Sequence, residues 1–270
     1  MSMRAATGIL CLPVSLAVLV TSCARPAHHA SVSTTPAPKP GSSVQRLSEP
    51  ESASPDPRVG AIFRGVSQEG GSLHVCTGSV VHSAGGDLVL TAAHCLLGEM
   101  DATFVPGFAG EATTTDTFTV DEVYFDARWI ASRDPRADYA IAKVRGAGPV
   151  ERRAGAALSL GAAPPAGSRV RVTGYPAGVG GRPIACEGAT GVTEGGFPSL
   201  PCKGLVDGTS GAPWISGSTV VGVVGGFEGG GCTESVSYSA PFDERTTQLL
   251  ARAEAGGPGD SPPADYDDTC

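Results

Sequence analysis

Short apolar runs, each closed by a turn that contains glycine or proline, recur along most of the chain. They predict strands over residues 73–81, 88–91, 118–125, 140–144, 169–174, 212–215 and 219–224. In one of them Val170 and Val172 alternate with arginines, which is the period of a strand that is buried on one face. The 38 glycines suit the many tight turns that such strands require. The pattern predicts an antiparallel all-β domain.

Only one segment of the sequence has a pattern that predicts a helix. Asp243 can cap the run 244–253, in which Leu249 and Leu250 form a modest apolar face. We therefore expect an all-β fold with a C-terminal α-helix, and the sequence contains no internal repeat.

The first residues predict export. Residues 1–22 contain the positive Arg4 and an apolar stretch at 9–20 that is too short to span a bilayer as a mature helix, as in a signal peptide. The stretch 20–23 resembles a bacterial lipobox, in which the thiol of Cys23 takes the lipid. We expect a protein that is anchored by this lipid at the extracellular face of a bacterial cell membrane. An ordinary signal peptide with an incidental cysteine is the alternative and would give a secreted protein.

The rest of the chain divides by composition. Residues 23–57 are rich in Pro, Ser, Ala and Thr and predict a disordered linker. Residues 58–255 form the expected folded domain, and 256–270 form an acidic tail rich in glycine and proline. The net charge of −8, with no basic cluster, argues against a nucleic-acid partner. We expect a monomer.

The cysteines support export. Besides Cys11 in the signal and Cys23, six remain, at positions 76, 95, 186, 202, 232 and 270. An even number in an exported domain predicts disulfides. A zinc site is the alternative, but no CxxC pair or histidine-rich cluster favours it. We expect neither a metal nor an organic cofactor.

Three stretches carry candidate chemistry. His94 follows an apolar strand, Asp138 opens another, and Ser210 lies between glycines that permit a tight turn. The amides of Gly208 and Ser210 can point at one oxyanion. A buried Asp138 needs a partner such as an imidazole N–H. Taken singly, the histidine could be structural and the serine turn a plain turn, but their order predicts nucleophilic acyl transfer.

Two other carboxylates could take the place of Asp138. Asp126 and Asp134 are near it in sequence. Both stand among turn residues, so we expect them to be solvated.

The stretches TAAHC (91–95), DYAIA (138–142) and GTSGAP (208–213) resemble the signatures of the chymotrypsin/trypsin-like serine peptidases. The resemblance covers about residues 59–252 and is greatest to a secreted actinobacterial branch with a GTSG turn. It implies two packed antiparallel six-stranded β-barrels with the site between them. It also implies that His94 is the general base, Asp138 the orienting acid and Ser210 the nucleophile, and that Gly208 and Ser210 donate the oxyanion amides.

The resemblance further implies two disulfides. These are Cys76–Cys95, next to the histidine, and Cys186–Cys202, ahead of the nucleophile. Cys232 and Cys270 remain as a third pair, which would tie the acidic tail to the body.

The chain departs from the family pattern at several positions. Thr209 stands where an aspartate usually pairs with a newly cut N-terminus, so we hypothesise that no cut after Arg58 is needed. Gly204, Gly225 and Gly226 are expected to line a substrate pocket without charge. Gly225 also replaces a serine that often supports the catalytic carboxylate, so we expect a looser site.

The predicted activity is that of a serine endopeptidase with a polypeptide substrate. A catalytically silent trypsin-like fold that serves as a cell-surface binding module is the main alternative, and an esterase with the same triad is a minor one. An α/β-hydrolase is disfavoured because its serine precedes the other two residues.

Overall fold

The computed structural model describes residues 50–64, 74–98, 101–111, 113, 115–177, 181–233 and 235–264. The predicted signal peptide, Cys23 and Cys270 lie outside these ranges. In the described ranges no helix has the length and apolar character needed to cross a membrane.

The first half of the domain is a closed antiparallel barrel with the strand order β2-β3-β4-β7-β6-β5. Its strands are β2 (Val59–Arg64), β3 (His74–Val81), β4 (Leu88–Thr91), β5 (Ala102–Pro106), β6 (Phe118–Phe125) and β7 (Ala140–Arg145). Apolar side chains such as Leu90, Phe104 and Ile141 are fully buried in these strands. The barrel has no open edge, because β2 pairs with both β3 and β5.

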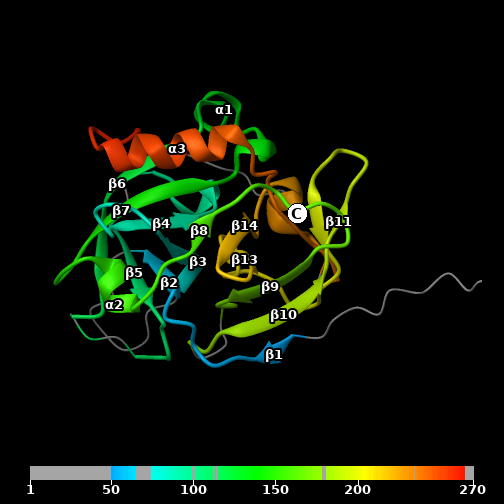
Figure 1. Cartoon of the computed structure of the whole chain (residues 1–270), viewed down its shortest axis with the longest axis horizontal. Coiled ribbons are helices and arrows are strands. Elements are labelled where there is room, and N and C mark those ends of the chain that lie inside the picture. The colour runs from blue at the N-terminus through cyan, green and yellow to red at the C-terminus, as the bar shows by residue number, and fades with distance from the viewer. Residues whose placement is uncertain are drawn as a thin grey trace, which may run out of the picture. The chain divides into compact units, whose positions relative to one another are not determined.

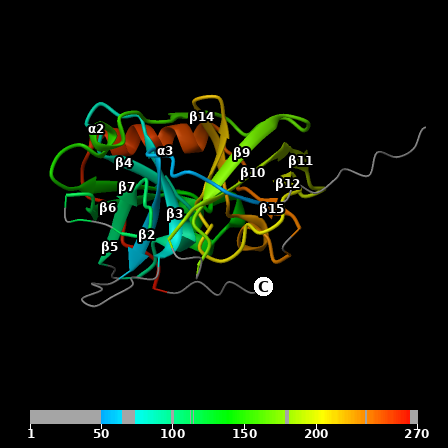
Figure 2. The same ribbon diagram turned by 90° about the horizontal axis from the view of Figure 1, so that it is seen from below.

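The second half consists of two sheets (Figures 1 and 2). The larger has the order β1-β10-β9-β13-β14-β8 and the smaller the order β11-β12-β15. Their strands are β1 (Glu51–Ser52), β8 (Ser159–Leu160), β9 (Arg169–Gly174), β10 (Ile184–Ala189), β11 (Gly191–Val192), β12 (Pro198–Leu200), β13 (Pro213–Ser216), β14 (Thr219–Val223) and β15 (Ser237–Tyr238). All pairs are antiparallel except β14 with β8, which is parallel, a detail that the sequence did not predict.

The predicted C-terminal helix is α3 (Glu244–Ala255), and Asp243 caps it in a capping box with Thr246. It runs across β6 and β7 of the barrel, as Figure 1 shows. Further short helices were not predicted: α1 (Ala127–Ser132), α2 (Val150–Ala154), and the 3-10 turns η1 (Ala93–Cys95), η2 (Pro135–Ala137) and η3 (Phe227–Gly230). The prediction of an all-β fold with a C-terminal helix is confirmed.

The two halves share a core. One apolar cluster joins Val81 and Tyr139 of the barrel to Val220 and Phe242 of the second half. Separate clusters fill the barrel and the larger sheet. The junction is therefore a packed apolar interface, and loops from both halves meet there.

The folded body extends beyond the predicted domain, residues 58–255, at both ends. Residues 50–57 fall in the range predicted as linker, yet Glu51 and Ser52 pair with β10 (Figure 1). In the range predicted as tail, Asp260 accepts a hydrogen bond from the amide of Phe125 at 2.7 Å and pairs with Arg252. Both segments therefore add contacts to the folded body.

Candidate active site

His94 lies in η1, directly after β4, and a disulfide holds this turn. Cys95 is joined to Cys76 of β3, with an S–S distance of 2.00 Å, as predicted. A ring nitrogen of His94 and the two sulfurs lie within 4.8 Å of one another. Because the sulfurs are bonded to each other, they are not thiolate ligands for a metal. The His94 side chain is 9% exposed, so most of its ring is enclosed.

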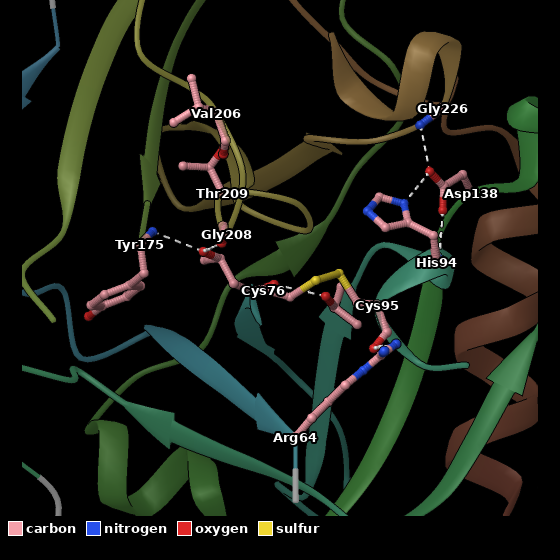
Figure 3. The surroundings of a disulfide bond; sticks show 12 residues. Arg64, Cys76, His94, Cys95, Asp138, Tyr175, Val206, Gly208, Thr209 and Gly226 are labelled. Carbon is pink, nitrogen blue, oxygen red and sulfur yellow. Dashed lines mark hydrogen bonds and ion pairs between the residues drawn. A yellow bond between two sulfur atoms is a disulfide. The ribbon is translucent and has the colours of Figure 1, made fainter. Parts of the chain in front are cut away.

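Asp138 is fully buried and orients the histidine (Figure 3). Its Oδ2 lies 2.8 Å from Nδ1 of His94, and its Oδ1 accepts a hydrogen bond from the backbone amide of His94 at 3.0 Å. Burial opposes the charge of this carboxylate, but the imidazole and the two amides that donate to it hold its pKa below the ordinary value. An ionised carboxylate at this position favours the tautomer of His94 with its proton on Nδ1, in which Nε2 is able to accept a proton.

The second amide that donates to Asp138 belongs to Gly226. Its N–H reaches Oδ2 at 2.7 Å, as Figure 3 shows. A Cβ on Gly226 would lie 2.7 Å from the amide nitrogen of Ala240, and its φ is +86°, so the position requires glycine. The looser site expected from the serine missing at Gly225 is thus compensated by a backbone donor.

Ser210 lies on a turn between Cys202 and β13 that packs against the barrel. Its carbonyl oxygen accepts a hydrogen bond from the amide of Thr77 in β3 at 2.8 Å. The next residue, Gly211, has φ +80°, and a Cβ there would lie 2.2 Å from the carbonyl oxygen of Thr77 and 2.9 Å from the amide nitrogen of Ala92. The backbone of the serine turn is therefore in contact with the segment that leads to His94.

The directions of the N–H groups of Gly208 and Ser210 follow from the hydrogen bonds of the carbonyl groups that precede them. The carbonyl of Asp207 accepts from the amide of Ala177 at 2.7 Å, and that of Thr209 accepts from Ala212 at 2.9 Å. In a trans peptide the N–H points opposite to the C=O, so both amides are turned away from these partners. Within the described part of the chain neither amide donates a hydrogen bond. Two such donors on one turn can bind a developing oxyanion.

The three glycines predicted to line a substrate pocket differ in their surroundings. Gly225 and Gly226 are buried beside Asp138, and a Cβ on Gly225 would lie 2.9 Å from its Oδ2. Gly204 is half-buried, and a Cβ there would meet Pro50 at 2.7 Å. The N-terminal segment thus covers one side of Gly204.

The alternative carboxylates are engaged elsewhere. Asp126 is only 7% exposed, which contradicts the expectation that it is solvated. It caps α1 and binds Arg128 and Tyr139, and these hydrogen bonds outweigh the effect of its burial and lower its pKa to about 2. Asp134 caps η2 by accepting from the amide of Arg136. Neither takes the place of Asp138 beside the histidine.

The second predicted disulfide, Cys186–Cys202, is also present and joins β10 to the strand end ahead of the serine turn. Cys232 is disulfide-bonded as well. Its predicted partner, Cys270, lies outside the described residues, so that pairing stays a prediction.

One residue that contributes to the site, Thr77, was missed by the sequence analysis, and another, Gly226, was assigned there only to a substrate pocket. The amide of Gly226 binds the carboxylate, and Thr77 binds the serine turn with both its backbone and its hydroxyl group. Thr77 directly follows Cys76, which marks it as a neighbour of the histidine turn. Its contacts span 131 residues of sequence, and no local pattern signals them.

Residues 76–224, more than half of the chain, match the model of the trypsin-like peptidase domain. No curated protein matches the chain by sequence. Among solved structures, the protease Anisep from Arthrobacter nicotinovorans is 23% identical, with a TM-score of 0.65, and the alignment covers 77% of this chain and 100% of that one.

Two further structures are similar. The thermostable serine protease AL20 from an extremophilic microorganism is 24% identical, with a TM-score of 0.63 and coverage of 75% of this chain and 99% of that one. Human heparin binding protein is 18% identical, with a TM-score of 0.61 and coverage of 78% and 99%. At these identities the likeness concerns the fold.

Proposed function

The chain belongs to the trypsin-like peptidase family, and on that premise we propose that it is a serine endopeptidase that uses His94, Asp138 and Ser210. The domain and its fold are those of serine peptidases. The observation that carries the proposal is the buried pair of Asp138 and His94, with Oδ2 and Nδ1 2.8 Å apart, beside a serine turn with two outward amides.

In the first step Oγ of Ser210 attacks the carbonyl carbon of the peptide bond while its proton passes to Nε2 of His94. The carbonyl π electrons move to the oxygen, which the amides of Gly208 and Ser210 stabilise. When the C–N bond breaks, the leaving amine takes the proton from His94. Ser210 is left as an acyl ester.

In the second step water attacks the ester carbon and gives one proton to His94. The bond between the acyl carbon and Oγ of Ser210 breaks, and His94 returns the proton to that oxygen. Asp138 stays ionised throughout and stabilises the imidazolium in both steps. This chemistry needs no cofactor.

A fluorophosphonate probe tests the proposal, because it reacts with a serine only where a base and an oxyanion site activate it. We expect the full chain to be labelled, labelling to be lost in Ser210→Ala, and labelling to persist in Ser216→Ala. Ser216 is an exposed serine at the end of β13 and serves as the matched control. A folded wild-type chain that takes no label and cleaves no casein would contradict the proposal.

The second candidate is a catalytically silent surface module that binds without turnover. It is favoured by the fact that a protein of this fold carries the name heparin binding protein. The same probe separates the two, since a silent module stays unlabelled.

For specificity, we propose that Gly204, Gly225 and Gly226 line a substrate pocket that has no charge of its own. A peptide library should then show cleavage after uncharged side chains. A strong preference for lysine or arginine before the cut would contradict this pocket.

For location, we propose a lipid on Cys23, with residues 1–22 removed as a signal and the part of the linker ahead of Pro50 as a tether. We also propose that the protein is a monomer. Within the trypsin-like peptidases, we propose that it belongs to the secreted actinobacterial branch that has the GTSG turn. A lipid adds about 0.8 kcal/mol of membrane affinity per buried CH₂. Cys23→Ser should therefore release the protein into the medium, and unchanged retention in the membrane would contradict the anchor.

A further inference from the structure

Among the described residues, none forms an ion pair with the turn that carries Gly208 and Ser210. Thr209 is fully buried and uncharged at the position where an aspartate would accept an ammonium group. Val59, which a cut after Arg58 would make terminal, is also fully buried, and its amide already donates to the carbonyl of Asp56 at 2.9 Å. Something else must hold the turn.

The hydroxyl of Thr209 holds one end of the turn. It donates to the carbonyl oxygen of Val206 at 2.7 Å, and the amide of Thr209 donates to the same oxygen at 2.9 Å. The methyl group of Thr209 packs against Gly174, where a Cβ would lie 3.3 Å from it. This residue therefore closes the loop 206–209 on itself and fixes it to the end of β9.

The hydroxyl of Thr77 holds the other side. It donates to the carbonyl oxygen of Gly208 at 3.0 Å and accepts from the amide of Tyr175 at 2.9 Å. Thr77 is fully buried and belongs to the barrel, whereas both partners belong to the second half. In Figure 3 Tyr175, Gly208 and Thr209 lie to the left of the disulfide, and His94 and Asp138 lie to its right.

The Thr77 hydroxyl acts directly on one peptide plane of the turn, and the Thr209 hydroxyl shares the acceptor that holds the N–H of that plane. The peptide between Gly208 and Thr209 is held at its C=O by Thr77 and at its N–H by Val206. This plane connects the two proposed oxyanion donors, so its rotation would turn Gly208 and Ser210 relative to each other.

We propose that the hydroxyls of Thr77 and Thr209 are positioning groups that keep the oxyanion turn in its donor-outward conformation without cleavage after Arg58. The proposal rests on the proposed peptidase function for its catalytic consequence. It assigns to two neutral hydrogen bonds the role that an ion pair would otherwise have.

The test compares Thr77→Val and Thr209→Val, which keep the shape of the side chain but lose the hydroxyl, with Thr77→Ser and Thr209→Ser. Thr190→Val is the matched control, since Thr190 is also buried and donates to a carbonyl, that of Pro165, at 2.9 Å. We expect both valine variants to lower kcat by roughly 10- to 100-fold with little change in KM. The serine variants should recover most of kcat, and Thr190→Val should leave it unchanged.

Two further measurements separate positioning from loss of stability. A peptide aldehyde, which forms an oxyanion on Ser210, should bind the valine variants more weakly by the same factor as kcat falls. Amide hydrogen exchange at Thr209, followed by NMR, should become faster in Thr77→Val and not in Thr190→Val. The exchange measurement needs no turnover, so it tests the positioning contact even if the proposed function is wrong.

The proposal is overturned if the valine variants match Thr190→Val in kcat, aldehyde affinity and exchange. Loss of activity in every variant with unaltered exchange would overturn it as well. Failure of fluorophosphonate labelling in the wild type, with exchange as expected, would count against the peptidase and not against the positioning role.

Discussion

The two sides of the active site are held by different interactions. On the barrel side, a charged and fully buried Asp138 fixes His94 with two hydrogen bonds, and a disulfide fixes the adjacent turn. On the other side, the turn of Ser210 is held by neutral backbone and hydroxyl hydrogen bonds and by glycines that allow close approach. The proposed base is thus positioned by charge, and the proposed nucleophile by backbone geometry.

This difference follows from what each side must do. The imidazole becomes charged during the proposed reaction, so an ionised partner stabilises it when that charge appears. The serine turn has to present two N–H groups to a developing anion, so the orientation of its peptide planes must be fixed. Hydrogen bonds to the backbone fix these planes directly.

The largest effect is expected from Asp138→Asn, which removes the charge from the barrel side. We expect kcat to fall about 10⁴-fold, because the neutral amide no longer fixes the Nδ1 proton and does not stabilise the imidazolium. Steady-state hydrolysis of a chromogenic ester measures this. Asp126 is a buried carboxylate outside the site, so the kcat of Asp126→Asn should stay within a few fold of wild type. Equal losses of kcat in Asp138→Asn and Asp126→Asn would show that Asp138 has no special role in the site.

The next effect concerns the glycine contact on the serine side. Gly211→Ala should lower the free energy of unfolding by about 3 kcal/mol or more, because a methyl group would overlap the Thr77 carbonyl and φ is +80°. Gly217→Ala, with φ +64° and no atom within 4 Å of its Cβ, should cost only about 1 kcal/mol. Urea denaturation of both variants measures the difference, and similar losses would show that the close approach is unimportant.

A smaller effect is expected in the pH dependence of the barrel side. The pKa of Asp126 is lowered from 3.8 to about 2 in the fold, so its contribution is fully present above about pH 4 and is lost as the pH falls through about 2. We expect Asp126→Asn to be less stable than wild type by about 2 kcal/mol at pH 7 and by less than about 0.5 kcal/mol at pH 2. Thermal unfolding of both proteins between pH 2 and pH 7 measures this difference in stability. A difference that does not change with pH would contradict the lowered pKa of Asp126.

The smallest effect is expected from a cut after Arg58. Because Thr209 cannot pair with an ammonium group, a protein cut after Arg58 that keeps its N-terminal fragment bound should have a kcat within about twofold of the intact chain. Active-site titration with the fluorophosphonate probe, followed by ester hydrolysis, measures this. A large gain in activity on cutting would show that the serine side depends on charge after all, and the contrast between the two sides would be lost.

Sequence patterns predicted the elements that depend on local residues. The strands at 118–125 and 169–174 and the Asp243 cap of α3 occur where expected, since alternation and capping are local signals. The pairing of Asp138 with His94 could be expected because a buried carboxylate needs a donor. Asp126 was misjudged because a turn-like sequence carries no sign that Arg128 and Tyr139 enclose it.

The limits of the domain were harder to predict. Residues 50–57 have the composition of a linker, and composition does not reveal that Glu51 and Ser52 pair with β10. The same holds for Asp260, whose partners lie on β6 and α3.

The sequence by itself determined the all-β class, the C-terminal helix, the family and the types of residue available for chemistry, because these depend on periodicity, capping and motif order. Only the tertiary structure decided that the amide of Gly226 supports Asp138 and that Thr77 holds the turn of Ser210. These contacts join residues 88 and 131 positions apart. They arise where the barrel and the second half of the domain meet, and their geometry is set by packing that no local pattern encodes.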